Sequence, residues 1–200
     1  MARPREVYGV DPADTIESNA DLIIPARVAD LLVWERYISD PSRVRELHQM
    51  RIAAKRLRYT MELFAPSYGP RFRDAIEKVK SIQEHIGALH DADVLTPQLQ
   101  EYLRHILQAS KKEADEKGAY TGDFDSASGL LLLCRKKRDE RKTRYRQFLT
   151  EWKALRASGL FESLKAVMKA ESLNKETEGE KSNGKQRSAR ANSSEPAIQE

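Results

Sequence analysis

The 200-residue sequence has a single cysteine, Cys134, so no disulfide can form within the chain. It has no apolar run near the roughly 20 residues that a membrane-spanning helix needs. Its N-terminus is not followed by the apolar stretch of a secretory signal. Because disulfides are rare in the reducing cytoplasm, these absences together favour a cytoplasmic protein and disfavour secreted and membrane-spanning classes.

Motifs of several enzyme classes are also missing. The sequence has no Gly-x-Gly or Gly-Lys-Ser/Thr loop for a nucleotide, and no serine in a nucleophile elbow. One cysteine and four scattered histidines give no zinc-site spacing. We therefore expect no catalysis, no cofactor and no bound metal.

The residues that are present favour helices and one domain. Hydrophobic residues make up 40% of the chain and charged residues 33%, with Leu, Ala, Glu, Lys and Arg dominant. Apolar periodicity predicts an all-α bundle of about six helices. We expect an irregular segment over 1–18, a helical domain over 19–173 and a disordered polar tail over 174–200. The expected helices cover about 25–38, 40–65, 71–89, 97–117, 125–157 and 159–173.

Proline and capping residues set these boundaries. Pro25 suits the first turn of a helix, and Asp40-Pro41 and Thr96-Pro97 each look like an N-cap followed by proline. His90 and Asp91 then lie in or near a turn between two helices.

The stretch 46–62 predicts a helix with two distinct faces. One face is an apolar stripe, and beside it His48, Arg51, Lys55 and Arg58 recur at i, i+3, i+7 and i+10. Like charges at this spacing repel one another, and a bound polyanion would offset that repulsion. A solvated basic face is the alternative interpretation.

Positive charge is concentrated in two segments. Residues 43–58 carry a net charge of +5 and residues 135–146 carry +6, whereas the whole chain carries only +4. Two such segments make one strong positive field only if they meet in space. We therefore expect them to pack side by side around a basic groove. Arg138 and Arg141 share the apolar sector of their helix, so either the helix changes register or they line that groove.

His48, His90-Asp91 and Asp93 allow a second interpretation. All-helical HD-type phosphohydrolases hold metals with a His, a later His-Asp pair and a distant Asp, and this order has a weak likeness to theirs. A metal site of that kind leaves Arg51 and Lys55 unexplained. His90 and Asp91 could instead cap the end of a helix.

Two ordered motifs resemble those of the CHAD domain, the conserved-histidine α-helical domain. The first is His48-x-x-Arg51-x-x-x-Lys55-Arg56-Leu57-Arg58-Tyr59, and the second is Ile86-Gly87-Ala88-Leu89-His90-Asp91-Ala92-Asp93-Val94. The resemblance covers roughly residues 20–172. It implies an all-helical bundle that binds inorganic polyphosphate and is associated with polyphosphate granules.

Matched residue by residue, the resemblance implies anion contacts in both motifs. Position 55 is Lys where Arg is frequent in the family, and a second His-x-x-Arg motif is not evident later in the chain. Basic residues of the segment 135–146 stand in its place. The expected polyphosphate ligands are His48, Arg51, Lys55, Arg56, Arg58, Lys80, His90, Arg135, Arg138, Arg141 and Lys142.

The chemistry of the basic segments agrees with this ligand. Polyphosphate has no bases to stack or read, and single-strand nucleic-acid binders interleave aromatic residues that are scarce here. Sequence-independent binding of nucleic acid through phosphate contacts remains the alternative partner, and no membrane partner is expected. The tail over 174–200 has five Lys and Arg against five Glu, so it adds no basic character.

Overall fold

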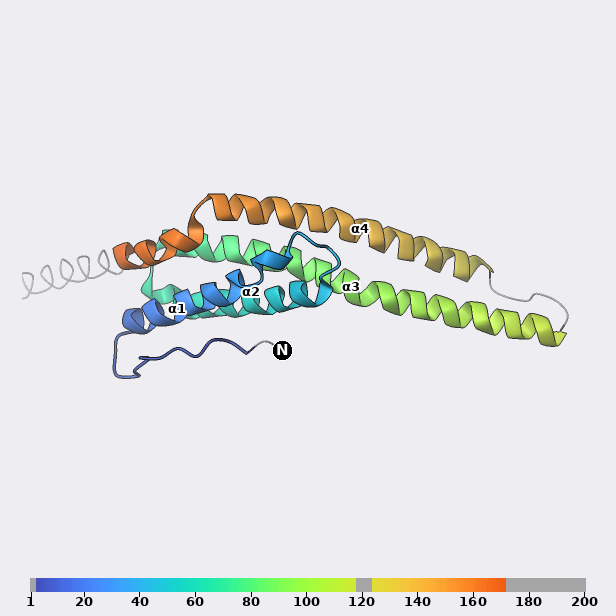
Figure 1. The fold of residues 1–200 in the computed structure, drawn as a ribbon, viewed down its shortest axis with the longest axis horizontal. Helices are drawn as coiled ribbons and strands as arrows, with labels where there is room; N and C mark the ends of the chain where they lie inside the picture. The colour runs from blue at the N-terminus through green and yellow to red at the C-terminus, as the bar shows by residue number, and fades with distance from the viewer. Residues whose placement is uncertain (1–2, 118–123, 172–200) are drawn as a thin grey trace, which may run out of the picture.

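The computed structural model describes residues 3–117 and 124–171, and these residues form helices without any strand (Figure 1). The all-α prediction is confirmed, with five α-helices in the described part instead of the six expected. The elements are α1 (Ile16–Leu32), the 3-10 helix η1 (Glu35–Tyr37), α2 (Val44–Phe64), the 3-10 helix η2 (Ala65–Ser67), α3 (Pro70–Lys117), α4 (Phe124–Ala157) and a terminal helix over residues 160–171.

α1 begins earlier than expected and contains Pro25 in its interior. The Thr15 side chain accepts a hydrogen bond from the backbone N–H of Ser18 and caps the helix, which ends at Leu32. Pro25 is tolerated because it lies on the exposed side, while Ile24 and Val28 continue the buried stripe on either side of it. The expected helix over 25–38 is therefore wrong at both ends.

α2 has the two faces that the sequence predicts, although it starts at Val44. Asp40 forms a turn by accepting hydrogen bonds from the backbone N–H (2.9 Å) and hydroxyl (2.6 Å) of Ser42, so Asp40-Pro41 precedes the helix. The apolar stripe is buried throughout, at Leu47, Met50, Ala53, Ala54, Leu57, Met61 and Phe64.

α3 is one continuous helix where two were expected. His90, Asp91 and Asp93 lie within it, so the turn predicted there is wrong, and Thr96-Pro97 does not start a helix. Pro97 lies on the exposed side, where loss of one N–H donor is compatible with a continuous helix. α4 runs alongside α3 (Figure 1) and contacts it through Ser81, His85 and Asp93, before this proline.

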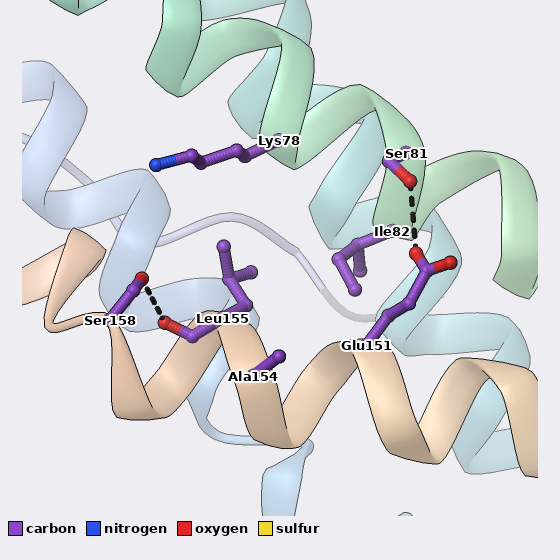
Figure 2. Close-up of a pocket in the computed structure, with 7 residues that line it drawn as sticks. All are labelled: Lys78, Ser81, Ile82, Glu151, Ala154, Leu155 and Ser158. Carbon is purple, nitrogen blue, oxygen red and sulfur yellow. Dashed lines mark hydrogen bonds between the residues drawn. The ribbon is translucent and has the colours of Figure 1, made fainter.

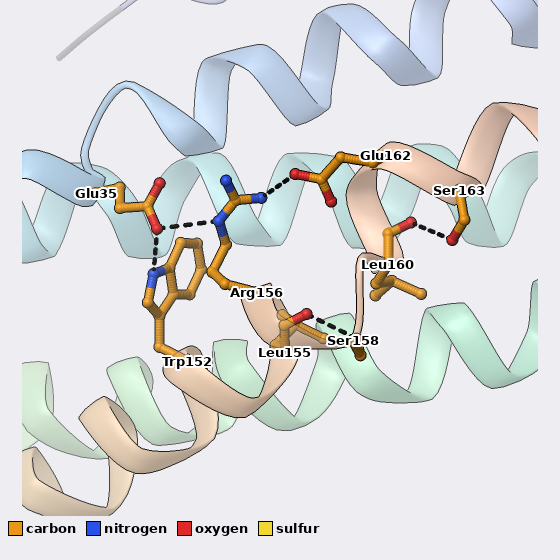
Figure 3. Close-up of polar contacts among 8 residues, drawn as sticks. All are labelled: Glu35, Trp152, Leu155, Arg156, Ser158, Leu160, Glu162 and Ser163. Atoms are coloured by element: carbon orange, nitrogen blue, oxygen red, sulfur yellow. Dashed lines mark hydrogen bonds and ion pairs between the residues drawn. The ribbon is translucent and has the colours of Figure 1, made fainter.

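The bundle at one end of the molecule holds the core, and the far halves of α3 and α4 extend from it together (Figure 1). Figure 3 shows one junction of the bundle, where Glu35 of η1 accepts hydrogen bonds from Trp152 Nε1 (2.9 Å) and Arg156 Nε (3.0 Å). Arg156 also pairs with Glu162 of the terminal helix at 2.7 Å. One arginine therefore joins η1, α4 and the terminal helix.

Glu171 of the terminal helix caps the start of α3. Its buried carboxylate accepts hydrogen bonds from the backbone N–H groups of Gly69 (2.8 Å), Arg71 (2.9 Å) and Phe72 (3.3 Å). A Cβ atom at position 69 would lie 3.1 Å from Glu171 Oε1, so glycine leaves room for the carboxylate. The negative charge also suits the positive end of the helix dipole.

Candidate functional site

His48 of α2 and His90 of α3 face each other, although 42 residues separate them. Their Nδ1 atoms lie 3.1 Å apart and their ring centroids 4.3 Å apart. A hydrogen bond at this distance needs one Nδ1 to donate and the other to accept, so the two rings take different tautomers. This contact joins the two motifs that the sequence pattern singled out.

The histidine contact also sets the register of the two helices. α2 and α3 are antiparallel and joined by η2, so each step from His48 along α2 matches a step back from His90 along α3. Arg51 is then level with Gly87, Lys55 with Gln83 and Arg58 with Lys80. We call His48, Arg51, Lys55, Arg58, Lys80, Gln83 and His90 the α2–α3 basic face.

Several polar groups of the α2–α3 basic face lack partners among the described residues. Arg51 and Lys55 form no ion pair with any carboxylate there. Arg58 forms an ion pair with Glu62, with 3.3 Å between Nε and Oε1, although its Nε makes no hydrogen bond. The buried Gln83 Oε1 accepts from no donor among the described residues. A Cβ atom built on Gly87 would meet nothing within 4 Å, so the space level with Arg51 is open. Unpaired cations beside open space can bind an anion without first breaking ion pairs.

His48 is electrostatically disfavoured as a cation in the unliganded protein. Burial lowers its pKa from the ordinary 6.5, and the nearby His90 and Arg51 lower it further. A bound anion would act in the opposite direction and favour the imidazolium.

Tyr59 places one aromatic ring among these cations. Lys55 Nζ lies 5.4 Å and the Arg58 guanidinium 4.7 Å from the ring centroid, and 48% of the residue remains exposed. The ring therefore holds both cations in place through cation–π contacts.

The structure places Arg56 away from the α2–α3 basic face. It lines a pocket between α1 and α2, together with Arg5, Asp30 and Trp34. Lys80 lies on the face and is 40% exposed at its side chain, where it pairs with Glu77 at 3.1 Å.

The basic residues of α4 lie outside the α2–α3 basic face. Arg141 is in the sector facing α3, where it forms an ion pair with Asp93 and donates to the Pro41 carbonyl at 2.8 Å. It therefore ties α4 to α3 and to the segment before α2, in place of lining an open groove. Arg135, Arg138 and Lys142 are exposed, and Lys142 pairs with Asp139 at 3.3 Å.

The expected packing of the two basic segments against each other is wrong for the described residues. α3 packs against both α2 and α4, while α2 and α4 share no extended interface in the part of the chain that the structure describes. Arg141 of the second segment contacts the chain just before the first segment, at the Pro41 carbonyl (2.8 Å).

The HD-type interpretation has little geometric support. Asp93 is bound by Arg141, and Asp91 is exposed on α3. Residues 3–117 and 124–171 contain no group of three or more His, Cys, Asp or Glu side chains arranged to hold a metal ion.

A cleft of about 240 Å³ lies between α3 and α4 (Figure 2). Its apolar floor includes Ile82 and Leu155, and Glu151 on its edge accepts from the Ser81 hydroxyl at 2.9 Å. Glu151 also pairs with His85 at 2.8 Å. None of the residues predicted to bind anions lines this cleft. The contacts of Glu151 with Ser81 and His85 join α3 to α4.

Comparison with known proteins gives one match. The family model described as CHAD domain matches residues 11–100, which include α1, α2 and the His90 segment of α3 but not α4. No curated protein and no solved structure matches the chain. The match is shorter than the resemblance over 20–172, so the basic residues of α4 lie outside it. In the described residues, no helix combines the length and apolarity needed to cross a membrane.

Proposed function

Through residues 11–100 this chain belongs to the CHAD domain family, and we propose that it binds inorganic polyphosphate on the α2–α3 basic face without catalysing a reaction. The family is one that binds polyphosphate, and the match includes every residue of this face. We propose further that binding places the protein at polyphosphate granules in the cytoplasm.

The observation that carries the proposal is the row of cations across two packed helices. His48, Arg51, Lys55 and Arg58 extend over ten residues of α2, which is about 15 Å of helix. Lys80 and His90 border the same row from α3. A flexible polyanion can follow such a row and bring several phosphates to fixed cations, because the helices are already ordered before binding.

The exposed cations of α4 have a supporting role in this proposal. Arg135, Arg138 and Lys142 would raise the local concentration of the anion by long-range attraction, or contact a chain that extends beyond Pro41. Arg141 contributes by fixing α4 next to α3, because its guanidinium already contacts Asp93 and Pro41.

A parallel titration tests the proposal. Long-chain polyphosphate, single-stranded RNA and duplex DNA, matched in total phosphate, should be added to the full chain at one salt concentration. We expect the tightest binding to polyphosphate. Equal or tighter binding of RNA or DNA would favour the nucleic-acid alternative.

A second assay tests the absence of catalysis. Polyphosphate and nucleotides should be incubated with the protein and magnesium, manganese or zinc, and released phosphate measured. We expect no release above the buffer control. Release that is lost in His90→Ala would support the HD-type alternative.

A further inference from the structure

A second pocket rich in arginine lies on the side of α2 that faces α1. It has a volume of about 190 Å³, and its walls come from the segment before α1, the end of α1 and α2. No residue of the α2–α3 basic face is among the described residues that line it. We call it the α1–α2 pocket and define it by Arg3, Arg5, Asp30, Trp34, Ile52 and Arg56.

Helical spacing explains why this pocket is separate from the α2–α3 basic face. Gln49, Ile52 and Arg56 follow one another at i, i+3 and i+7 and share one side of α2. His48 and Arg51 belong to a row that lies on another side of the same helix. An anion in the pocket is therefore bound independently of one on the α2–α3 basic face.

The segment before α1 forms one wall of the pocket and is held in place by α1. The backbone N–H of Arg5 donates to both carboxylate oxygens of Asp30, each at 3.2 Å. Arg27 donates to the Arg5 carbonyl at 2.8 Å and to Asp30 Oδ2 at 2.5 Å. The irregular segment is thus fixed at both its N–H and its carbonyl. A wall that is ordered beforehand loses less entropy when a ligand binds.

The α1–α2 pocket has an excess of positive charge. Arg3, Arg5 and Arg56 line it, and Asp30 is the one carboxylate among its described lining residues, so these residues sum to +2. The Asp30 side chain is only 12% exposed and already pairs with Arg27, whereas the Arg5 side chain is 55% exposed. The field in the pocket therefore attracts an anion.

The number of guanidinium groups favours a phosphoryl group over a carboxylate. Guanidinium groups bind phosphate and carboxylate oxygens through two parallel N–H donors. A phosphate monoester presents three outer oxygens and a carboxylate only two. Arginines from two separate segments, 3–5 and α2, can therefore surround a phosphoryl group more completely.

The remaining wall of the pocket is apolar. Trp34 is partly buried against the core, and Val33 and Ile52 lie beside it in the lining. Inorganic phosphate would leave this wall without a partner, whereas a ligand with an apolar group would cover it. At about 30 Å³ for each water, 190 Å³ is the volume of about six waters, which limits the ligand to a small molecule.

We propose that the α1–α2 pocket binds a small phosphate monoester. The phosphoryl group lies among Arg3, Arg5 and Arg56, and the apolar group of the ester packs against Trp34 and Ile52. The site differs from the proposed polyphosphate site in position and in ligand. The inference therefore does not rest on polyphosphate binding, and either can fail without the other.

Phenyl phosphate is a suitable probe, with inorganic phosphate and benzoate as comparisons. Isothermal titration calorimetry of the full chain should give the tightest binding for phenyl phosphate, because inorganic phosphate lacks the apolar group and benzoate has two oxygens. Tryptophan fluorescence locates the site, since the chain has two tryptophans and Trp152 is 1% exposed. Trp34→Phe should abolish the change in emission while phenyl phosphate still binds.

Arginine variants test the same site. Arg56→Gln should raise the dissociation constant of phenyl phosphate about tenfold or more, as loss of a charge-assisted hydrogen bond predicts. Arg3→Gln is the second variant if Arg56→Gln loses helicity by circular dichroism. Arg73→Gln is the matched control, because Arg73 is exposed on α3 and does not line the pocket.

Three results would overturn the proposal. The first is the absence of saturable binding of phenyl phosphate. The second is inorganic phosphate or benzoate binding as tightly as phenyl phosphate. The third is a loss of phenyl phosphate binding in Arg51→Ala or Arg73→Gln equal to that in Arg56→Gln, which would place the probe outside the α1–α2 pocket.

Discussion

Two cations of the α2–α3 basic face, Arg51 and Lys55, have no carboxylate partner among the described residues, whereas Arg58 and Lys80 pair with Glu62 and Glu77. Arg141 and Arg156 are held by carboxylates, whereas Arg51 faces none among the described residues. A guanidinium that already has a carboxylate partner must break that contact before it binds a phosphate. The sequence pattern alone does not show which of these arginines has a carboxylate partner.

We predict that Arg51→Ala weakens polyphosphate binding by about tenfold or more. A charge-assisted hydrogen bond contributes roughly 1.5–3 kcal/mol, and 1.4 kcal/mol corresponds to a factor of ten. Isothermal titration calorimetry at fixed salt measures the change. Arg104→Ala is the control, since Arg104 is an exposed arginine in the C-terminal half of α3 that pairs with Glu101 at 3.2 Å. Equal losses in both variants would argue against a localised site.

We predict that polyphosphate binds more tightly as pH falls from about 8 to 6, with His48 responsible for the change. Without ligand the pKa of His48 is lowered by burial, His90 and Arg51, and a bound polyanion raises it again. Proton and ligand therefore strengthen each other's binding. His48→Gln should flatten the pH profile measured with long chains, whose titrating ends are few. Parallel pH profiles for wild type and variant would show that His48 does not cause the pH dependence and serves only as a structural hydrogen-bonding residue.

The lowered pKa of His48 makes the free protein less stable at low pH, whereas low pH strengthens ligand binding. Because the folded state lowers the pKa of His48, the unfolded chain binds more protons near pH 6. The contribution of His48 to the free energy of unfolding is therefore complete above the unfolded pKa of about 6.5 and decreases as pH falls below it. Saturating polyphosphate should reduce this decrease.

At the scale of elements, helix ends depend on partners that local sequence does not reveal. Thr96-Pro97 looks like a helix start, yet α3 continues through it with α4 alongside. Conversely, the start of α3 depends on Glu171, about 100 residues later in the chain.

We predict that Glu171→Ala lowers the free energy of unfolding by about 1–3 kcal/mol. The variant leaves three backbone N–H groups at the start of α3 without their acceptor and removes a charge that favours the helix dipole. Urea denaturation followed by circular dichroism measures the loss. Glu84→Ala provides the comparison, as Glu84 is exposed in the middle of α3. If the two variants were equally stable, the cap would contribute nothing measurable.

At the scale of the whole molecule, charge is distributed unevenly. Residues 43–58 and 135–146 together carry a net charge of +11, whereas the rest of the chain sums to −7. Residues 174–200 balance five Lys and Arg against five Glu. Polyphosphate should therefore be attracted to the helical part of the chain rather than to its C-terminal end.

We predict that deleting residues 174–200 changes polyphosphate affinity by less than twofold, about 0.4 kcal/mol. A near-neutral segment adds little to the attraction of a polyanion. Titration of full-length and shortened chains at low salt, where charge effects are largest, measures the difference. Loss of binding on deletion, together with normal binding by Arg51→Ala, would place the site in the tail.

Periodicity and charge in the sequence were sufficient to predict the all-α class, the buried stripe of α2 and the row His48, Arg51, Lys55 and Arg58, because a helix with 3.6 residues per turn sets which side chains share a face. Only the tertiary structure decided which helices pack together. It brought His90 to His48 and paired Arg141 with Asp93. These outcomes depend on contacts between residues more than 40 positions apart, and neither helical periodicity nor local capping signals carry information about such contacts.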